Sequence, residues 1–284
     1  MTLLENISRM CQAFDGRAGV SILDLQTGQQ VDYQGDEIFP TASVIKLPIL
    51  ITLMQQCQRG AASLDDPLML RRGEMVAGSG LLRYLTPGAV LPLRDWAFLM
   101  MHVSDNLATN VIIDYVGLEN VQAWLREAGY PTVQLYRKIT FSEPPPDKKH
   151  FGTASPRELT QLMAAVFRRQ LVSREACAEM MRMMDMVGQD RVGRYLPFTP
   201  AGSDVPGGAR LRMAGKTGRQ IGSRVQTAVV WSGEWASARG FAITVMTEGN
   251  PEPETYSVDA PGSLLIGRIA RAAYDHLLEK PAAD

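Results

Sequence analysis

Three short motifs in this chain carry side chains suited to acyl transfer. They are Ser43–Lys46 (Ser-Val-Ile-Lys), Ser104–Asn106 (Ser-Asp-Asn) and Lys216–Gly218 (Lys-Thr-Gly), in that order along 284 residues. A serine hydroxyl is a weak nucleophile at neutral pH and becomes reactive when a base lies within hydrogen-bond reach. Each motif alone arises by chance in many chains, but the three in order indicate one nucleophilic site.

The first motif places a nucleophile and its candidate base on one helix. Ser43 and Lys46 stand three residues apart at the start of a predicted helix over 44–57, so they share a face about one turn apart. Free backbone N–H groups at a helix start favour developing negative charge on Ser43. Lys46 is useful as a neutral amine, and a second cation such as Lys216 favours that form. Without the other motifs, Ser43 would be interpreted as a plain helix cap.

The second motif follows an apolar helix that ends near Val103. A loop at this point permits Ser104 and Asn106 to approach the first motif. The alternative is a plain N-cap for the next predicted helix, over 108–115. His102, just before the motif, is interpreted as a helix-end residue.

Predicted strands at both ends bracket a helical middle. The strand patterns cover 19–25, 30–33, 211–215, 225–232 and 240–247, and Thr27-Gly28 supplies a turn. The helical patterns cover 3–14, 44–57, 93–102, 108–115, 120–128, 156–169 and 264–278. A helix rich in methionine near residues 180–186 is better explained by core packing than by a cofactor.

Strands that are distant in sequence can share one antiparallel sheet. We therefore expect an α/β (α+β) fold with a five-stranded antiparallel sheet built from both chain ends and flanked by helices. Residues 1–42 and 197–284 would form this α/β part, and residues 43–196 an inserted all-α part.

Composition excludes several other classes of function. The net charge of −1, from 29 basic and 30 acidic residues, gives no electrostatic case for nucleic acid or an anionic membrane. The three cysteines and three histidines are widely spaced, so neither a zinc site nor a disulfide framework is indicated. We expect a monomer without a cofactor. Residues 1–6 lack the pattern of an export signal, which predicts a cytoplasmic protein, or a periplasmic or extracellular one if a signal was removed.

The three motifs together resemble those of class A β-lactamases and penicillin-binding proteins. Two stretches resemble the loop that borders the active site in that family, 78–82 (Gly-Ser-Gly-Leu-Leu) and 85–88 (Leu-Thr-Pro-Gly). The resemblance covers roughly residues 18–275. It implies the same fold and a serine hydrolase that works through an acyl-enzyme at Ser43, on β-lactams or related amides and esters.

The resemblance also implies roles for the second motif. Ser104 would relay a proton to the leaving nitrogen of the substrate. Asn106 would hydrogen-bond both Lys46 and a substrate amide.

The third motif is expected to recognise the substrate. Lys216 and Thr217 would bind a carboxylate, and the small Gly218 would let the ligand approach a strand edge. The backbone N–H of Arg219, with that of the nucleophile, would form an oxyanion hole. Arg224, six residues after Gly218, resembles the family's carboxylate-binding arginine, and the alternative is an exposed strand arginine.

The sequence departs from the family in the residues expected to catalyse deacylation, the hydrolysis of the acyl-enzyme. Class A enzymes use a glutamate in an E-x-x-L-N loop between the second and third motifs. Here Glu143-Pro144 is the partial match, and Asp147 stands at the asparagine position. Glu143 is therefore the candidate deacylating base, and the alternative is a solvated loop glutamate. Without such a base the site suits a DD-peptidase, a small-ester hydrolase, or a sensor of penicillin or peptidoglycan fragments that acylates without turnover.

Overall fold

A computed structural model describes residues 1–140, 151–185, 190–198, 211–249 and 257–279. The contacts divide the chain into two compact units. The first consists of Met1–Phe39, Ala154–Ala165 and Met186–Asp284, and the second of Pro40–Thr153 and Val166–Asp185. The expected boundaries at residues 43 and 197 differ from this division, because residues 154–165 and the segment after 186 group with the sheet.

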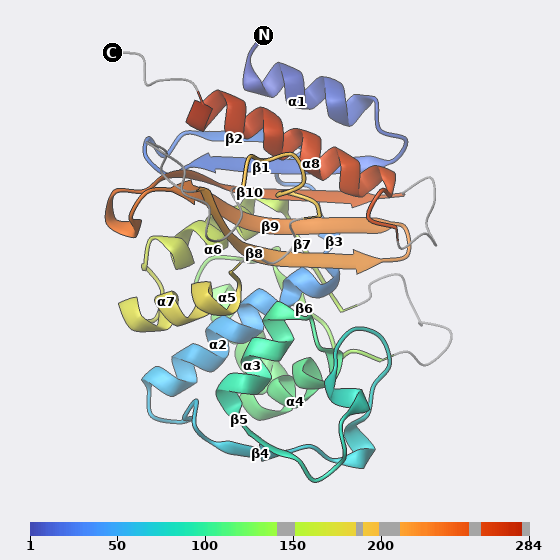
Figure 1. Cartoon of the computed structure of the whole chain (residues 1–284), viewed down its shortest axis with the longest axis vertical. Helices are drawn as coiled ribbons and strands as arrows, with labels where there is room; N and C mark the ends of the chain where they lie inside the picture. The colour runs from blue at the N-terminus through green and yellow to red at the C-terminus, as the bar shows by residue number, and fades with distance from the viewer. Residues whose placement is uncertain (141–150, 186–189, 199–210, 250–256, 280–284) are drawn as a thin grey trace. The chain divides into compact units, whose positions relative to one another are not determined.

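The first unit is built on a five-stranded antiparallel sheet from both ends of the chain, as predicted (Figure 1). Its strand order is β2-β1-β10-β9-β8, so β8 lies at one edge. The strands are β1 (Arg17–Asp24), β2 (Gln30–Tyr33), β8 (Leu211–Gln220), β9 (Ser223–Ser232) and β10 (Arg239–Glu248).

β8 contains both the apolar stretch 211–215 and the Lys-Thr-Gly motif, which was predicted to lie on a strand. The strand continues to Gln220 and pairs with β9 throughout. Gly222 turns the chain into β9 with a φ of 72°, a conformation that glycine adopts without strain.

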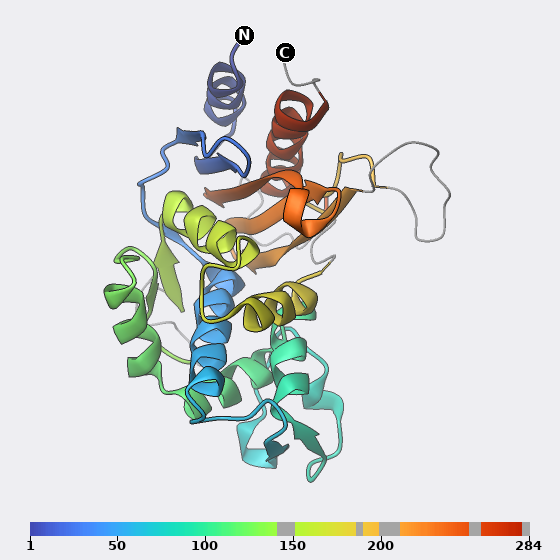
Figure 2. The same ribbon diagram turned by 90° about the vertical axis from the view of Figure 1, so that its left-hand side faces the viewer.

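Helices cover both faces of this sheet (Figure 2). Side chains alternate along each strand, and those on one face form an apolar core with α1 (Leu3–Gln12) and α8 (Pro261–Tyr274). The opposite face includes the buried hydroxyl-bearing residues Ser21, Thr227 and Thr244. There α6 (Pro156–Phe167) is held by hydrogen bonds from Thr160 Oγ1 to the Ser21 carbonyl and from Thr227 Oγ1 to the Leu159 carbonyl.

The second unit is mainly helical. It contains a 3-10 turn, η1 (Ala42–Ile45), four α-helices, and the later helix α7 (Arg174–Met183). The four are α2 (Lys46–Gln58), α3 (Leu93–His102), α4 (Asn106–Val116) and α5 (Leu118–Glu127). Short strand pairs complete it, with β4 (Pro67–Met69) paired to β5 (Val90–Pro92) and β6 (Gln134–Leu135) to β7 (Gly152–Ala154). β3 (Phe39–Pro40) lies at the boundary of the units.

The methionines near the end of this unit fill its core, as predicted. Their side chains are buried at 180, 181, 183 and 184, and Met186 lies outside the described residues. Among the described helices, none has the length and apolar character needed to cross a bilayer.

The amphipathic helix α1 provides a test of core packing. Ile7 is 0% exposed and Leu4 is 44% exposed on the same helix. We expect Ile7→Ala to lower the free energy of unfolding by about 2–5 kcal/mol and Leu4→Ala by less than about 0.5 kcal/mol. Urea denaturation of both variants measures this difference. Equal losses would mean that α1 is not anchored through its buried face.

Candidate active site

Ser43 lies on the 3-10 turn that leads directly into α2. The turn spans Ala42–Ile45, and the backbone N–H of Lys46 donates to the Ser43 carbonyl, so the two residues are one turn apart. Ser43 is partly exposed, whereas Lys46 is fully buried. The predicted helix start is therefore a tighter turn than expected, and it keeps the serine at the surface with the lysine beneath it.

The buried Lys46 amine is satisfied by the second motif. Its Nζ lies 2.8 Å from the Ser104 carbonyl oxygen, 2.9 Å from Ser104 Oγ and 3.1 Å from Asn106 Oδ1. Ser104 reaches these positions with a φ of 56°, which costs a non-glycine residue conformational energy. The predicted approach of Ser104 and Asn106 to the first motif is confirmed by these three contacts.

Asp105 holds the second motif in place by accepting hydrogen bonds from two backbone segments. Its Oδ1 accepts the Ala108 N–H at 3.0 Å, which makes Asp105 the N-cap of α4. Its Oδ2 accepts the N–H groups of Leu81 and Leu82 at 2.6 and 2.9 Å. A Cβ on Gly80 would collide with this carboxylate. The cap interpretation is therefore correct for Asp105, and it coexists with the contacts of its two neighbours to Lys46.

The loop of residues 77–82 is tied to the same motif. The Asn106 N–H donates to the Ser79 carbonyl at 3.0 Å, and Asn106 Nδ2 donates to the Ala77 carbonyl at 3.1 Å. One side chain thus links Lys46 to this loop. His102, by contrast, is exposed at the end of α3 and stacks on Phe98, as expected of a helix-end residue.

The chain that enters the Glu143 loop is anchored on α4. Asn110 Oδ1 accepts the Ile139 N–H and Asn110 Nδ2 donates to the Ile139 carbonyl, both at 2.8 Å. Lys138 Nζ lies 2.7 Å from Asp114 Oδ2. Glu143 itself lies outside the described residues.

The third motif belongs to the other unit, on the edge strand β8. Lys216 is fully buried and its Nζ donates to the Thr217 carbonyl at 3.1 Å. Thr217 is partly exposed. Because β8 is the edge strand, the Lys-Thr-Gly segment pairs with β9 alone among the described strands. An edge of this kind suits the expected approach of a ligand backbone.

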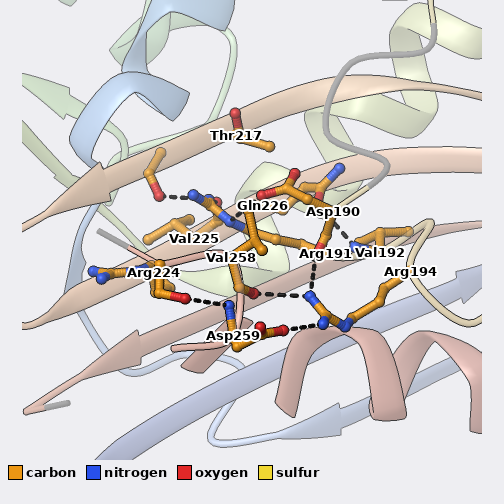
Figure 3. A network of polar contacts seen from close by, with 12 residues as sticks. Asp190, Arg191, Val192, Arg194, Thr217, Arg224, Val225, Gln226, Val258 and Asp259 are labelled. Atoms are coloured by element: carbon orange, nitrogen blue, oxygen red, sulfur yellow. Dashed lines mark hydrogen bonds and ion pairs between the residues drawn. The ribbon is translucent and has the colours of Figure 1, made fainter. Parts of the chain in front are cut away.

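Positive charges cluster around this segment (Figure 3). Burial, with a smaller contribution from the nearby Arg191, lowers the pKa of Lys216 to about 7. Arg224 is fully buried, and its Nη1 donates to the carbonyls of Gln220 and Ser223 at 3.1 and 2.9 Å. The alternative of an exposed strand arginine is therefore wrong for Arg224. Arg219 is exposed on the same hairpin.

Arg191 is the residue that the sequence did not indicate. Its side chain is buried, and Nη1 donates to the carbonyls of Gly218 and Val225 at 2.8 and 2.9 Å. Gly218 and Val225 are cross-strand partners, so one guanidinium connects β8 to β9 beside the third motif. No motif marks Arg191, because the carbonyls that it binds stand 27 and 34 residues later in the chain.

Comparison with known proteins identifies relatives along nearly the whole chain. A model of the Beta-lactamase enzyme family matches residues 2–277. β-Lactamase CARB-3 of Pseudomonas aeruginosa is 28% identical over 225 residues, which cover 78% of this chain and 74% of that protein. A β-lactamase of Rhodobacter capsulatus is 27% identical over 190 residues, 66% of this chain and 64% of that protein, just under two thirds of its length.

Solved structures show the same fold. A β-lactamase from Sphaerobacter thermophilus matches with a TM-score of 0.84 and 28% identity over 98% of both chains. A mutant of PBP-A, solved as an acyl-enzyme complex with penicillin G, matches with a TM-score of 0.81 and 24% identity over 98% of this chain and 97% of that one.

The low pKa of Lys216 predicts a pH-dependent stability. Between pH 7 and the usual lysine pKa of 10.5, the unfolded chain binds a proton that the folded chain does not. The cost of burying Lys216 is therefore complete below pH 7 and disappears as the pH rises toward 10.5. We expect Lys216→Met to be more stable than the wild type at pH 6, with a difference that shrinks toward pH 10. Urea midpoints at pH 6, 8 and 10 test this, and a constant difference would contradict it.

Proposed function

Because the chain belongs to the Beta-lactamase enzyme family, we propose that it is a serine hydrolase that forms an acyl-enzyme at Ser43. Its substrates are β-lactams or related amides and esters that carry a carboxylate. The main support is the buried Lys46 amine, held by Ser104 and Asn106 one turn from Ser43. This arrangement supports the assignment of Lys46 as the base, Ser104 as the hydroxyl relay and the partly exposed Ser43 as the nucleophile.

Acylation follows from the positions of these groups. Ser43 Oγ attacks the carbonyl carbon of the substrate, and its proton passes to Lys46 Nζ. When the amide C–N bond breaks, the departing nitrogen takes a proton from Ser104 Oγ, which lies 2.9 Å from Lys46 Nζ and recovers a proton from it. The net result is an ester on Ser43 and a neutral leaving amine, with Lys46 ready for the next proton transfer.

Substrate recognition is assigned to the Lys-Thr-Gly strand. Lys216 and the Thr217 hydroxyl bind the substrate carboxylate, and Gly218 leaves room at the strand edge. Arg224 adds positive charge from within the hairpin, where its Nη1 already bonds the backbone. The N–H groups of Ser43 and Arg219 form the oxyanion hole. A small-molecule substrate and a site supplied by one chain require no second subunit, so we propose a monomer.

Deacylation is the step in which this protein departs from an efficient β-lactamase. In the described residues that lead into this loop, the residue bonded to Asn110 of α4 is Ile139, which has no carboxylate. In the sequence, Glu143 immediately precedes three consecutive prolines, and prolines restrict the conformations available to a segment. This favours behaviour like that of a penicillin-binding protein, with rapid acylation and slow release.

Ser43→Ala tests the nucleophile. We expect it to abolish covalent labelling by a fluorescent penicillin or a fluorophosphonate while the circular dichroism spectrum stays unchanged. Lys46→Ala should reduce acylation almost as severely, since residues that act as a unit are not additive. Undiminished labelling of folded Ser43→Ala protein would refute the assignment.

Glu143→Gln tests the deacylating base. We expect the wild type to form an acyl-enzyme with penicillin rapidly and lose it slowly, as followed by intact mass over time. The substitution should change the deacylation rate by less than about threefold, under ~1 kcal/mol. A fast wild-type turnover that Glu143→Gln traps as an adduct would show instead an ordinary class A β-lactamase.

A further inference from the structure

Arg191 binds the carbonyl of the peptide bond whose N–H is assigned to the oxyanion hole. Its Nη1 donates to the Gly218 carbonyl at 2.8 Å and to the Val225 carbonyl at 2.9 Å. The Gly218 carbonyl and the Arg219 N–H belong to one planar peptide unit, so neither group can turn without the other. A contact to the carbonyl therefore holds the N–H as well.

The register of the hairpin gives the direction of that N–H. Gly218 of β8 and Val225 of β9 lie directly opposite each other. In an antiparallel pair, the carbonyls of two opposite residues both face the partner strand or both face away from it. Because one nitrogen reaches both carbonyls here, both must face the space between the strands. Across the trans peptide, the Arg219 N–H then points toward the edge of β8 where no other described strand pairs.

The backbone of Arg191 is held from two sides. The N–H of Val192, the next residue, donates to Gln226 Oε1 of β9 at 3.0 Å. The Arg191 carbonyl lies against Gly267 of α8, where an added Cβ would come within 2.9 Å of it. The guanidinium therefore reaches the two carbonyls from a backbone that is fixed between β9 and α8.

The Arg191 side chain keeps its charge at neutral pH. Burial lowers the pKa of Arg191 to about 10, which still leaves the guanidinium protonated at pH 7. Hydrogen bonds from a charged donor are stronger than neutral ones. A donor on the carbonyl also polarises the amide and makes its N–H a better donor in turn.

We propose that Arg191 is a positioning residue for acyl transfer, which fixes and polarises the Gly218–Arg219 peptide so that the Arg219 N–H stabilises the oxyanion. This inference rests on the proposed acylation of Ser43. When Ser43 Oγ attacks, the π electrons of the substrate carbonyl move onto its oxygen, and they return when the bond to the leaving group breaks. A donor already aimed at that oxygen stabilises the charge without reorganisation. Arg191 thus acts on the rate of acylation and not on the substrate carboxylate.

The test compares Arg191→Met with Arg194→Met. Arg194 stands on the same short segment, but it binds Asp259 and the Val258 carbonyl instead of the hairpin. Benzylpenicillin carries a carboxylate and p-nitrophenyl acetate does not, so the acylation rate is measured with both.

We expect Arg191→Met to slow acylation about 10-fold with both substrates, less than the roughly 100-fold lost with a whole oxyanion donor. Arg194→Met should leave both rates unchanged. A loss confined to benzylpenicillin would overturn the proposal, since Arg191 would then act on the carboxylate. Unchanged rates in Arg191→Met would overturn it as well.

An infrared measurement separates polarisation of the peptide from a general loosening of the strand. The stretch of the ester carbonyl in the acyl-enzyme falls as hydrogen bonds to its oxygen strengthen. With benzylpenicillin isotopically labelled at the β-lactam carbonyl, we expect a higher frequency in Arg191→Met than in the wild type or Arg194→Met. Arg191→Lys retains a charged donor and should lie between them, and it replaces Arg191→Met if that variant does not fold. An unchanged frequency in the folded, acylated variant would overturn the proposal.

The protein without substrate gives a further measurement that does not depend on Ser43. A hydrogen bond to a peptide carbonyl moves the amide nitrogen resonance of the following residue downfield. The Arg219 resonance should therefore move upfield in Arg191→Met and stay in place in Arg194→Met. An unmoved resonance refutes the polarisation whether or not Ser43 is acylated.

The wild type separates this inference from the proposed function. If neither benzylpenicillin nor p-nitrophenyl acetate acylates it, the proposed function fails, whatever the Arg219 resonance does. If the wild type is acylated at Ser43 and Arg191→Met matches it in rate, ester frequency and amide resonance, the proposed function stands and the role of Arg191 is refuted.

Discussion

A lysine that is shielded from water must find its hydrogen-bond partners within the fold, and Lys46 finds them in Ser104 and Asn106. An unsatisfied buried amine would cost several kcal/mol, so the approach of these residues is also a requirement for folding. The positive φ of Ser104 is a local strain that this requirement explains. The same contacts that stabilise the unit prepare its chemistry.

The rest of the helical unit supports this contact. Asp105 caps α4 and holds the backbone of residues 81–82, and Asn106 reaches the carbonyl of Ala77. A motif of three residues therefore fixes a helix start, a loop and a lysine together. The loop that enters the Glu143 segment is held by the next turn of α4, through Asn110. Neighbouring turns of one helix thus hold Lys46 and the chain that enters the Glu143 segment.

In the sheet unit, several positively charged side chains are buried near the hairpin of β8 and β9. Lys216, Arg191 and Arg224 are all buried close to one hairpin, where like charges disfavour one another. Backbone carbonyls offset part of this cost, since Arg191 binds Gly218 and Val225 while Arg224 binds Gln220 and Ser223. Burial, with a smaller contribution from the charge of Arg191, lowers the pKa of Lys216 to about 7. Burying these positive charges together lowers the stability of the folded protein. An anionic ligand group bound here would reduce the repulsion between them.

The sequence by itself determined the five-stranded sheet from both chain ends, most helices, and the pairing of the first two motifs. These follow from alternating and helical apolar patterns and from residue types that need one another. It did not determine the division into units, because residues 154–165 group with the sheet through contacts that no local pattern records. The places of Arg191 and Ile139 were decided by tertiary structure alone. Arg191 donates to backbone carbonyls far away in sequence, and the Ile139 backbone bonds to the side chain of Asn110, 29 residues earlier. Backbone groups are the same in every residue, so no local pattern records either contact.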